Sequence, residues 1–196
     1  MPIVLIDNYD SFTYNLFQLV QGLTEEPVEV YRNNAIDFKT LKSLKPSRVI
    51  LSPGPGHPKN PSDFGVCQPA IEGQDELDCP ILGVCLGHQG IAHYFGAQIE
   101  AAPEILHGKT STVEVIEESP LLNGLPSRFQ AMRYHSLIVN EENLPDCLQV
   151  TAREMTQNLI MALQHKERPL FGVQFHPESI GTPHGTQLLR NFIERC

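Results

Sequence analysis

The sequence predicts a single-domain α/β fold with a mostly parallel central sheet, helices on its faces and added antiparallel strands on one side. Two observations lead to this class. In the first half, a continuous apolar run at 3–6 and a strand-like segment at 48–51 alternate with segments of helical periodicity, a pattern typical of βαβ units. In the second half, short strand-like segments are separated by turn residues such as Asn123-Gly124, which favours antiparallel strands.

The first half alternates strand and helix from its start. Residues 3–6 form a continuous apolar run, as expected for a strand buried on both faces. Apolar residues between 12 and 23 fall on one helical face, and Asp10 or Ser11 is in position to cap that helix. A strand, a short helix and another strand complete the pattern over 28–31, 38–44 and 48–51. The order βαβαβ implies right-handed crossovers and parallel neighbours.

The remaining elements begin in the same pattern and then change character. We expect a helix over 65–71, an apolar strand over 80–82 and a helix that begins near Gly90. Strand-like segments then predominate, at 97–100, 110–116, 128–132, 134–139, 147–152 and 159–164. An apolar strand over 169–175 and a helix over 185–195 end the chain.

Length, charge and cysteine usage limit the class of protein. The chain has 196 residues, enough for one sizeable core, so one domain over 1–196 is expected. The net charge of −9 argues against a nucleic acid or an anionic membrane as partner. No apolar run approaches a membrane span, and residues 1–7 lack the features of a signal peptide. Five cysteines, with no metal-binding spacing, indicate a cytoplasmic protein without a bound metal.

The segment Gly83-Val84-Cys85-Leu86-Gly87 has the form of a nucleophile elbow with cysteine at its centre. Such a turn holds the central residue in a strained conformation, and a Cβ at either flanking glycine would collide with neighbouring backbone. The helix that follows favours an anion at its N-terminus and offers N–H groups to an oxyanion. The alternative is a structural cysteine in a tight turn. Without evidence from the rest of the chain, this segment would favour the structural interpretation.

A candidate base for this cysteine lies in Gly172-Val173-Gln174-Phe175-His176-Pro177-Glu178-Ser179. Thiolate chemistry needs a base near the sulfur and a group that orients the base. His176 follows an apolar strand, where parallel-sheet proteins place site residues. Glu178 is two residues away, so its carboxylate can reach the imidazole. A solvated turn is the alternative for this segment by itself, and the two segments together are far more specific.

Together these segments resemble the class I, or triad, glutamine amidotransferase family. Four further landmarks occur in the family's order and resemble the glutaminase component of anthranilate synthase and of aminodeoxychorismate synthase: 7–13, 52–56, His107-Gly108-Lys109 and 133–137. The match runs from the first strand to the last helix. It implies a flavodoxin-like sheet and a Cys85, His176 and Glu178 triad that hydrolyses the side-chain amide of L-glutamine to glutamate and ammonia.

The resemblance also implies roles for residues around the triad. Two backbone N–H groups would form the oxyanion hole, those of Gly56 and Leu86. Residues that would contact glutamine are Gly54, Pro55, Gly56, Leu86, Gln89, Ser136 and Leu137. Each of them, taken alone, could also be purely structural.

A partner is expected, because ammonia released into neutral water would be protonated and the chain is short for an acceptor site. The resemblance implies a chorismate-binding synthase subunit that holds Mg²⁺, and it implies no cofactor in this chain. Candidate partner-facing segments are 9–11, His57 and 133–135, with local turn structure as the equal alternative. The extended loop over 57–64 resembles that of some fused aminodeoxychorismate synthases, so both products, anthranilate and aminodeoxychorismate, stay open.

Three other interpretations fit some of the same residues. One keeps the fold and makes the protein a cysteine hydrolase of γ-glutamyl bonds or peptides. Another makes it a non-catalytic docking subunit, against which the intact Cys85, His176 and Glu178 argue. A redox-sensing thiol is possible but is not needed to explain the motifs.

Overall fold

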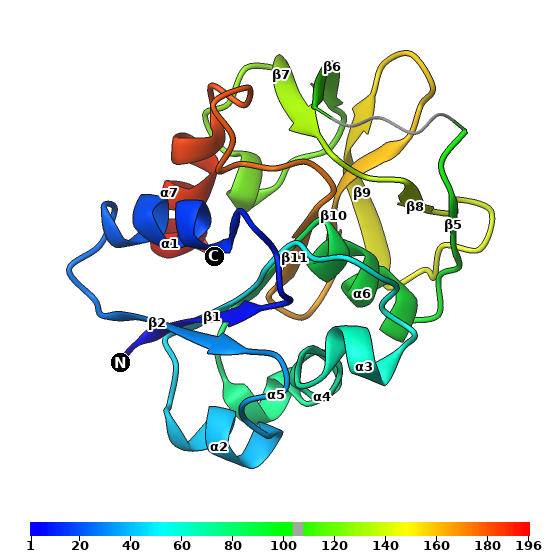
Figure 1. Cartoon of the computed structure of the whole chain (residues 1–196). Coiled ribbons are helices and arrows are strands. Elements are labelled where there is room, and N and C mark those ends of the chain that lie inside the picture. Colours follow the sequence, from blue (N-terminus) through cyan, green and yellow to red (C-terminus); the bar gives the residue numbers. More distant parts are fainter. Residues whose placement is uncertain (104–107) are drawn as a thin grey trace.

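The computed structural model describes residues 1–103 and 108–196. Within that part of the chain, a nine-stranded sheet has the order β2-β1-β3-β4-β11-β10-β9-β6-β7, and β5 pairs with β8 separately (Figure 1). The strands are β1 (Ile3–Asp7), β2 (Val28–Arg32), β3 (Arg48–Leu51), β4 (Ile81–Val84), β5 (Ile99–Ala101), β6 (Lys109–Val115), β7 (Arg128–Arg133), β8 (Leu137–Val139), β9 (Leu148–Glu154), β10 (Ile160–His165) and β11 (Leu170–Val173). The helices are α1 (Thr13–Gln21), α2 (Phe38–Ser43), α3 (Pro61–Phe64), α4 (Cys67–Glu72), α5 (Gln74–Leu77), α6 (Leu86–Tyr94), the 3₁₀ turn η1 (Pro120–Leu122) and α7 (Gly185–Arg195).

One half of the large sheet is parallel and the other is antiparallel. Strands β2, β1, β3, β4 and β11 run parallel to one another, and this spatial order is that of flavodoxin-like sheets. Strands β10, β9, β6 and β7 continue the sheet as antiparallel neighbours. The predicted fold class, with antiparallel strands added on one side, is therefore confirmed.

Each face of the parallel strands packs into its own apolar cluster. In β1, Ile3 and Leu5 enter the cluster that contains residues of α1 and α7, whereas Val4 and Ile6 enter the one that contains residues of α2, α4 and α6. Figure 1 shows α1 and α7 together on one side of these strands and α2, α4 and α5 on the other. Burial on both faces explains why β1 is a continuous apolar run.

The predicted helix over 65–71 is present as α4, which begins two residues later at Cys67 and ends at Glu72. Gly65 stays outside it, because its φ is 45° and a Cβ there would overlap the backbone carbonyl of Asn33. The predicted cap of the first helix is wrong. Neither Asp10 nor Ser11 caps the first helix, because α1 begins at Thr13 and the Asp10 carboxylate accepts the N–H of Phe12 in the preceding turn.

The expected strand over 134–139 is also interrupted. Strand β7 ends at Arg133, and the chain turns away so that β8 pairs with β5 instead of extending the large sheet. The predicted landmark at His107 lies outside the described residues.

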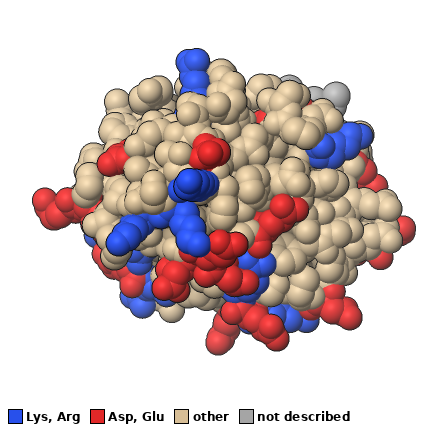
Figure 2. Space-filling model, turned by 90° about the horizontal axis from the view of Figure 1, so that it is seen from below, with Lys and Arg blue, Asp and Glu red and all other residues tan. Residues whose placement is uncertain are grey.

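The structure also bears on surface charge and on membrane-spanning helices. The face seen in Figure 2 carries acidic and basic side chains intermixed. Among the described residues, no helix is both long and apolar enough to cross a membrane.

Candidate active site

Cys85 occupies a strained turn between β4 and α6. Its φ and ψ are 52° and −98°, a conformation that non-glycine residues rarely adopt. A Cβ on Gly83 would overlap the backbone of Gly87, and a Cβ on Gly87 would lie 2.5 Å from the carbonyl oxygen of Leu51. The predicted steric need for both glycines is confirmed, and the geometry is that of a nucleophile elbow.

The elbow lies beside the end of β11, the parallel neighbour of β4. The N–H of Cys85 donates to the carbonyl of Val173, the last residue of β11, at 2.8 Å. The carboxyl ends of parallel strands meet at one edge of a sheet, so the residues that follow β11 are brought to the sulfur. His176, three positions beyond Val173, is one of them, and its side chain is 3% exposed.

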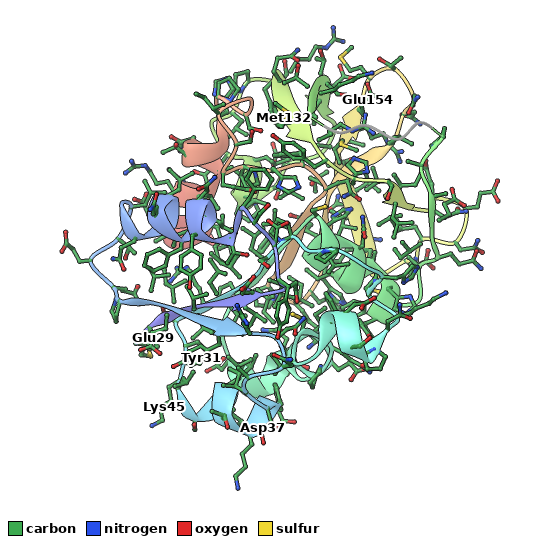
Figure 3. The ribbon with its side chains drawn as sticks, viewed as in Figure 1. Glu29, Tyr31, Asp37, Lys45, Met132 and Glu154 are labelled. Carbon is green, nitrogen blue, oxygen red and sulfur yellow. The ribbon has the colours of Figure 1, made fainter. Side chains whose placement is uncertain are left out.

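Backbone and hydroxyl contacts hold the turn that carries His176. The N–H of His176 donates to the carbonyl of Met132 at 3.1 Å, and the hydroxyl of Thr182 donates to the carbonyl of His176 at 2.7 Å. The same hydroxyl accepts the N–H of Met132 at 3.0 Å. Figure 3 labels Met132 on β7, so a strand from the antiparallel half of the molecule supports the predicted base.

The imidazole of His176 is paired with Glu178. Nδ1 lies 2.6 Å from Oε1 of Glu178, whose side chain is 1% exposed, and an ionised carboxylate can only accept, so Nδ1 carries a proton. Burial by itself disfavours the charged imidazole. The interactions with Cys85 and Glu178 outweigh that effect and raise the pKa of His176 to about 10. Nδ1 is taken by Glu178, so the buried Nε2 is the ring nitrogen that is left to interact with Cys85.

Two aromatic rings pack against this imidazole. The ring of Tyr134 lies edge-on to His176 with centroids 5.0 Å apart, and Phe12 stacks on Tyr134 at 5.1 Å. Phe12 also meets the imidazole edge-on at 6.1 Å. These contacts restrict the ring and limit its access to water. Sequence reasoning gave neither residue this role, because the contact joins segments far apart in the chain.

The loop after β3 is anchored against the loop after β1. The N–H of Asn8 donates to the hydroxyl of Ser52 and its side-chain amide donates to the carbonyl of Ser52, each at 2.8 Å. A Cβ on Gly54 would lie 2.5 Å from the carbonyl oxygen of Asn8 and 3.0 Å from the side chain of Leu86. Gly56 has a φ of 91°. The loop that carries Gly54, Pro55 and Gly56 therefore lies next to the start of α6.

The other predicted glutamine contacts also lie near Cys85. Gln89 on α6 donates through its side-chain amide to the carbonyl of Leu137 at 3.0 Å. That carbonyl also lies 2.9 Å from Nδ1 of His135. The carbonyl of Ser136 accepts the N–H of Ala102 at 2.8 Å. Both carbonyl groups of the Ser136-Leu137 segment are thus engaged within the protein. The roles of these residues in substrate and oxyanion binding stay predictions.

The prediction that the segment 133–135 faces a partner is wrong for Arg133 and His135. Arg133 and His135 are 1% and 3% exposed, so neither side chain can face a partner. Nε of Arg133 lies 3.0 Å from Nε2 of His135, and burial together with this guanidinium lowers the pKa of His135 to about 3. Tyr9, in contrast, is 47% exposed. The buried pair is structural, because it supports the Leu137 carbonyl through the ring of His135.

The described residues contain no group of three or more His, Cys, Asp or Glu side chains that could hold a metal ion. All five cysteines lie within the described residues, and each is free.

Comparisons with known proteins agree on one family. The family model for class I glutamine amidotransferases matches residues 4–196. Anthranilate synthase component 2 of Methanothermobacter thermautotrophicus is 47% identical, with 97% of each chain covered. Aminodeoxychorismate/anthranilate synthase component 2 of Bacillus subtilis is also 47% identical, over 98% of this chain and 95% of its own. A solved structure from Thermoplasma acidophilum, assigned to GMP synthase, superposes with a TM-score of 0.85 at 28% identity, covering 98% of this chain and 92% of that chain.

Proposed function

The chain belongs to the class I glutamine amidotransferase family, and we propose that it is the glutaminase subunit of a synthase that aminates chorismate. The observation that carries this proposal is the position of the elbow sulfur of Cys85 beside the buried pair of His176 and Glu178. Within that pair, Nδ1 of His176 lies 2.6 Å from Oε1 of Glu178. Relatives that match almost its full length are named as component 2 of anthranilate synthase.

The first half-reaction uses all three residues. The Cys85 thiolate attacks the side-chain amide carbon of glutamine, and His176 gives its proton to the leaving nitrogen, because an expelled amide anion would be far too basic. The raised pKa of His176 keeps that proton in place at neutral pH. Glu178 fixes the tautomer and stabilises the imidazolium. The products are ammonia and a thioester between the glutamyl group and Cys85.

The second half-reaction releases glutamate. His176, now neutral, takes a proton from water as the water attacks the thioester, and the sulfur leaves as the thiolate. In both halves the oxyanion would accept hydrogen bonds from the N–H groups of Leu86 and Gly56. Leu86 is the first residue of α6, and N–H groups at that position have no partner within the helix. Losing one such donor typically costs on the order of 10²–10³ in rate.

The edge that carries the reaction also carries exposed apolar side chains. Tyr9 follows β1 and is 47% exposed, and Ile180, two residues beyond Glu178, is fully exposed. Both follow the carboxyl ends of parallel strands. This supports docking of the synthase subunit over the active-site edge, where ammonia could pass to it without entering bulk water. Chorismate and Mg²⁺ belong to that subunit in this proposal, and this chain needs no cofactor.

Anthranilate is the proposed product of the complex. A second product, aminodeoxychorismate, is supported by the Bacillus subtilis relative, whose name includes both synthases. One chain serving both partners is therefore an alternative. We place the protein in the cytoplasm, because its five free cysteines suit a reducing compartment.

The test combines the purified chain with candidate synthase subunits from its own source, glutamine, chorismate and Mg²⁺. Anthranilate supports the first proposal. Formation of 4-aminobenzoate after a lyase is added supports the second. A Cys85→Ser chain should stop product formation from glutamine but not from added ammonia. No glutamate release with any partner, or release from γ-glutamyl peptides instead, would overturn the assignment.

A further inference from the structure

Two glutamine side chains connect the Leu137 carbonyl to the nucleophilic sulfur. Nε2 of Gln89 lies 3.0 Å from the carbonyl oxygen of Leu137 and 3.2 Å from Oε1 of Gln174. Nε2 of Gln174 lies 3.6 Å from Sγ of Cys85. Gln174 directly follows β11, so the β4–β11 pairing that brings His176 to the elbow also brings this amide. The proposed mechanism gives Gln174 no role.

The Leu137 carbonyl determines which group donates and which accepts in each of these hydrogen bonds. A backbone carbonyl can only accept, so Gln89 must present its NH₂ group to Leu137. The same NH₂ group then donates to Gln174, which must accept through Oε1. The remaining group of Gln174, its own NH₂, is therefore the one that faces Cys85. The orientation of both amides follows from the network.

The surroundings make this donor effective. Gln174 is 0% exposed, Gln89 is 3% exposed and Cys85 is 8% exposed. Water therefore competes poorly for the sulfur, and hydrogen bonds to an ionised group are stronger than those to a neutral one. A thiol gains little from an added donor, whereas a thiolate gains a partner for its charge. The amide also stays neutral and keeps its protons over the whole range of pH.

The titratable groups around the sulfur act differently. His176 faces it from the segment after β11, with Glu178 behind, and Asp10 on the loop after β1 interacts with both. His88 on α6 and His135 beside β8 have lowered pKa values, about 4 and about 3, so both are neutral near pH 7. Gln174 does not titrate, so its contribution can be separated from theirs by substitution.

We propose that Gln174 is a catalytic residue whose amide donates to the sulfur of Cys85 and stabilises its anionic form. The donor favours the thiolate before attack. It favours the same thiolate as the leaving group when the thioester is hydrolysed, with the electron pair of the broken C–S bond returning to sulfur. The proposal rests on the proposed function for the identity of the nucleophile, but the reactivity of the sulfur tests it without any turnover.

The experiment measures alkylation of Cys85 by iodoacetamide as a function of pH, in the full chain without glutamine. Mass spectrometry of the peptide that contains Cys85 separates its reaction from that of the other thiols. Gln174→Met keeps the length of the side chain and removes the donor. We expect its pH profile to move up by about one unit, with alkylation about tenfold slower below the midpoint. Gln164→Met, in β10 and bonded to Gln149, is the matched control and should leave the profile unchanged.

The proposal is overturned if the midpoint of the alkylation profile is the same in Gln174→Met as in wild type while the two proteins unfold similarly in urea. If that variant does not fold, Gln174→Glu replaces it, because it keeps the shape and sets an acid against the sulfur; an upward shift is again required. Failure of Cys85 to react in the wild-type chain would instead contradict the proposed function.

Discussion

Val84 and Val173 are paired in register across the parallel strands β4 and β11, although 88 other residues separate them in the chain. The next residue after β4 is Cys85, and the next after β11 is Gln174. This pairing places the elbow sulfur, an amide donor and the His176 turn at one edge of the sheet.

Cys85→Ser should abolish hydrolysis of glutamine while glutamine still binds. Serine keeps the turn but lacks a readily ionised nucleophile, and loss of a nucleophile in a concerted triad costs at least about a thousandfold in kcat. Glutamate release measures turnover, and calorimetric titration measures binding. Turnover near that of wild type would refute the assignment of the nucleophile.

Gly87→Ala should destabilise the fold by about 2–3 kcal/mol, because its Cβ would lie 2.5 Å from the carbonyl oxygen of Leu51 and force the elbow to shift. Urea unfolding measures this change. Gly22→Ala is the control, because Gly22 has a helical φ of −74° and a Cβ added there would lie 3.4 Å or more from its nearest neighbouring atoms. It should change the free energy of unfolding by less than about 1 kcal/mol. Equal effects of the two substitutions would contradict the steric argument.

His88 should make the protein sensitive to acid. Burial lowers the pKa of its ring from 6.5 to about 4. The fully buried neutral ring therefore stabilises the fold above pH 6.5, and this contribution is lost as the pH falls towards 4, because the unfolded state then binds more protons. Between pH 7 and pH 5 the loss amounts to about 2 kcal/mol.

His88→Gln provides the comparison, because glutamine does not titrate. Urea unfolding at both pH values should show a smaller loss in this variant than in wild type, by about the same 2 kcal/mol. Parallel losses in the two proteins would show that other groups, such as His135, dominate the acid response.

Tyr134→Leu should lower kcat for glutamine hydrolysis by about 2–10-fold. The edge-on contact with His176, at 5.0 Å, orients the imidazole, and such aromatic pairs contribute about 0.5–1.5 kcal/mol beyond their buried area. Tyr14→Leu is the matched control, because Tyr14 is 63% exposed and lies on α1. If the two variants have the same kcat, the aromatic contact does not position the base.

Much of the site could be predicted because its chemistry is local. The elbow needs glycine at 83 and 87 for steric reasons that operate within a few residues, and the structure places Cys85 at a φ of 52° as that argument requires. The His176–Glu178 contact spans two residues and is likewise a local feature.

Other predictions failed where distant segments decide the environment. Arg133 and His135 are polar and lie at and just beyond the end of β7, so they resembled surface residues, yet they are buried and support the Leu137 carbonyl. Gln174 lay within a motif, but no local pattern shows that its amide meets the sulfur of a residue on another strand. The later start of the helix predicted over 65–71, at Cys67, depends on the close approach of Gly65 to Asn33, which belongs to a different loop.

The sequence by itself determined the alternation of strands and helices, the fold class, the strained cysteine turn and the adjacent acid–base pair. Each follows from periodicity or from sterics over a few residues. The tertiary structure alone decided that β11 lies beside β4, that Phe12 and Tyr134 enclose the imidazole, and that Gln89 orients Gln174 towards the sulfur. Strand order and side-chain networks depend on long-range packing and on the hydrogen bonds that buried polar groups must find.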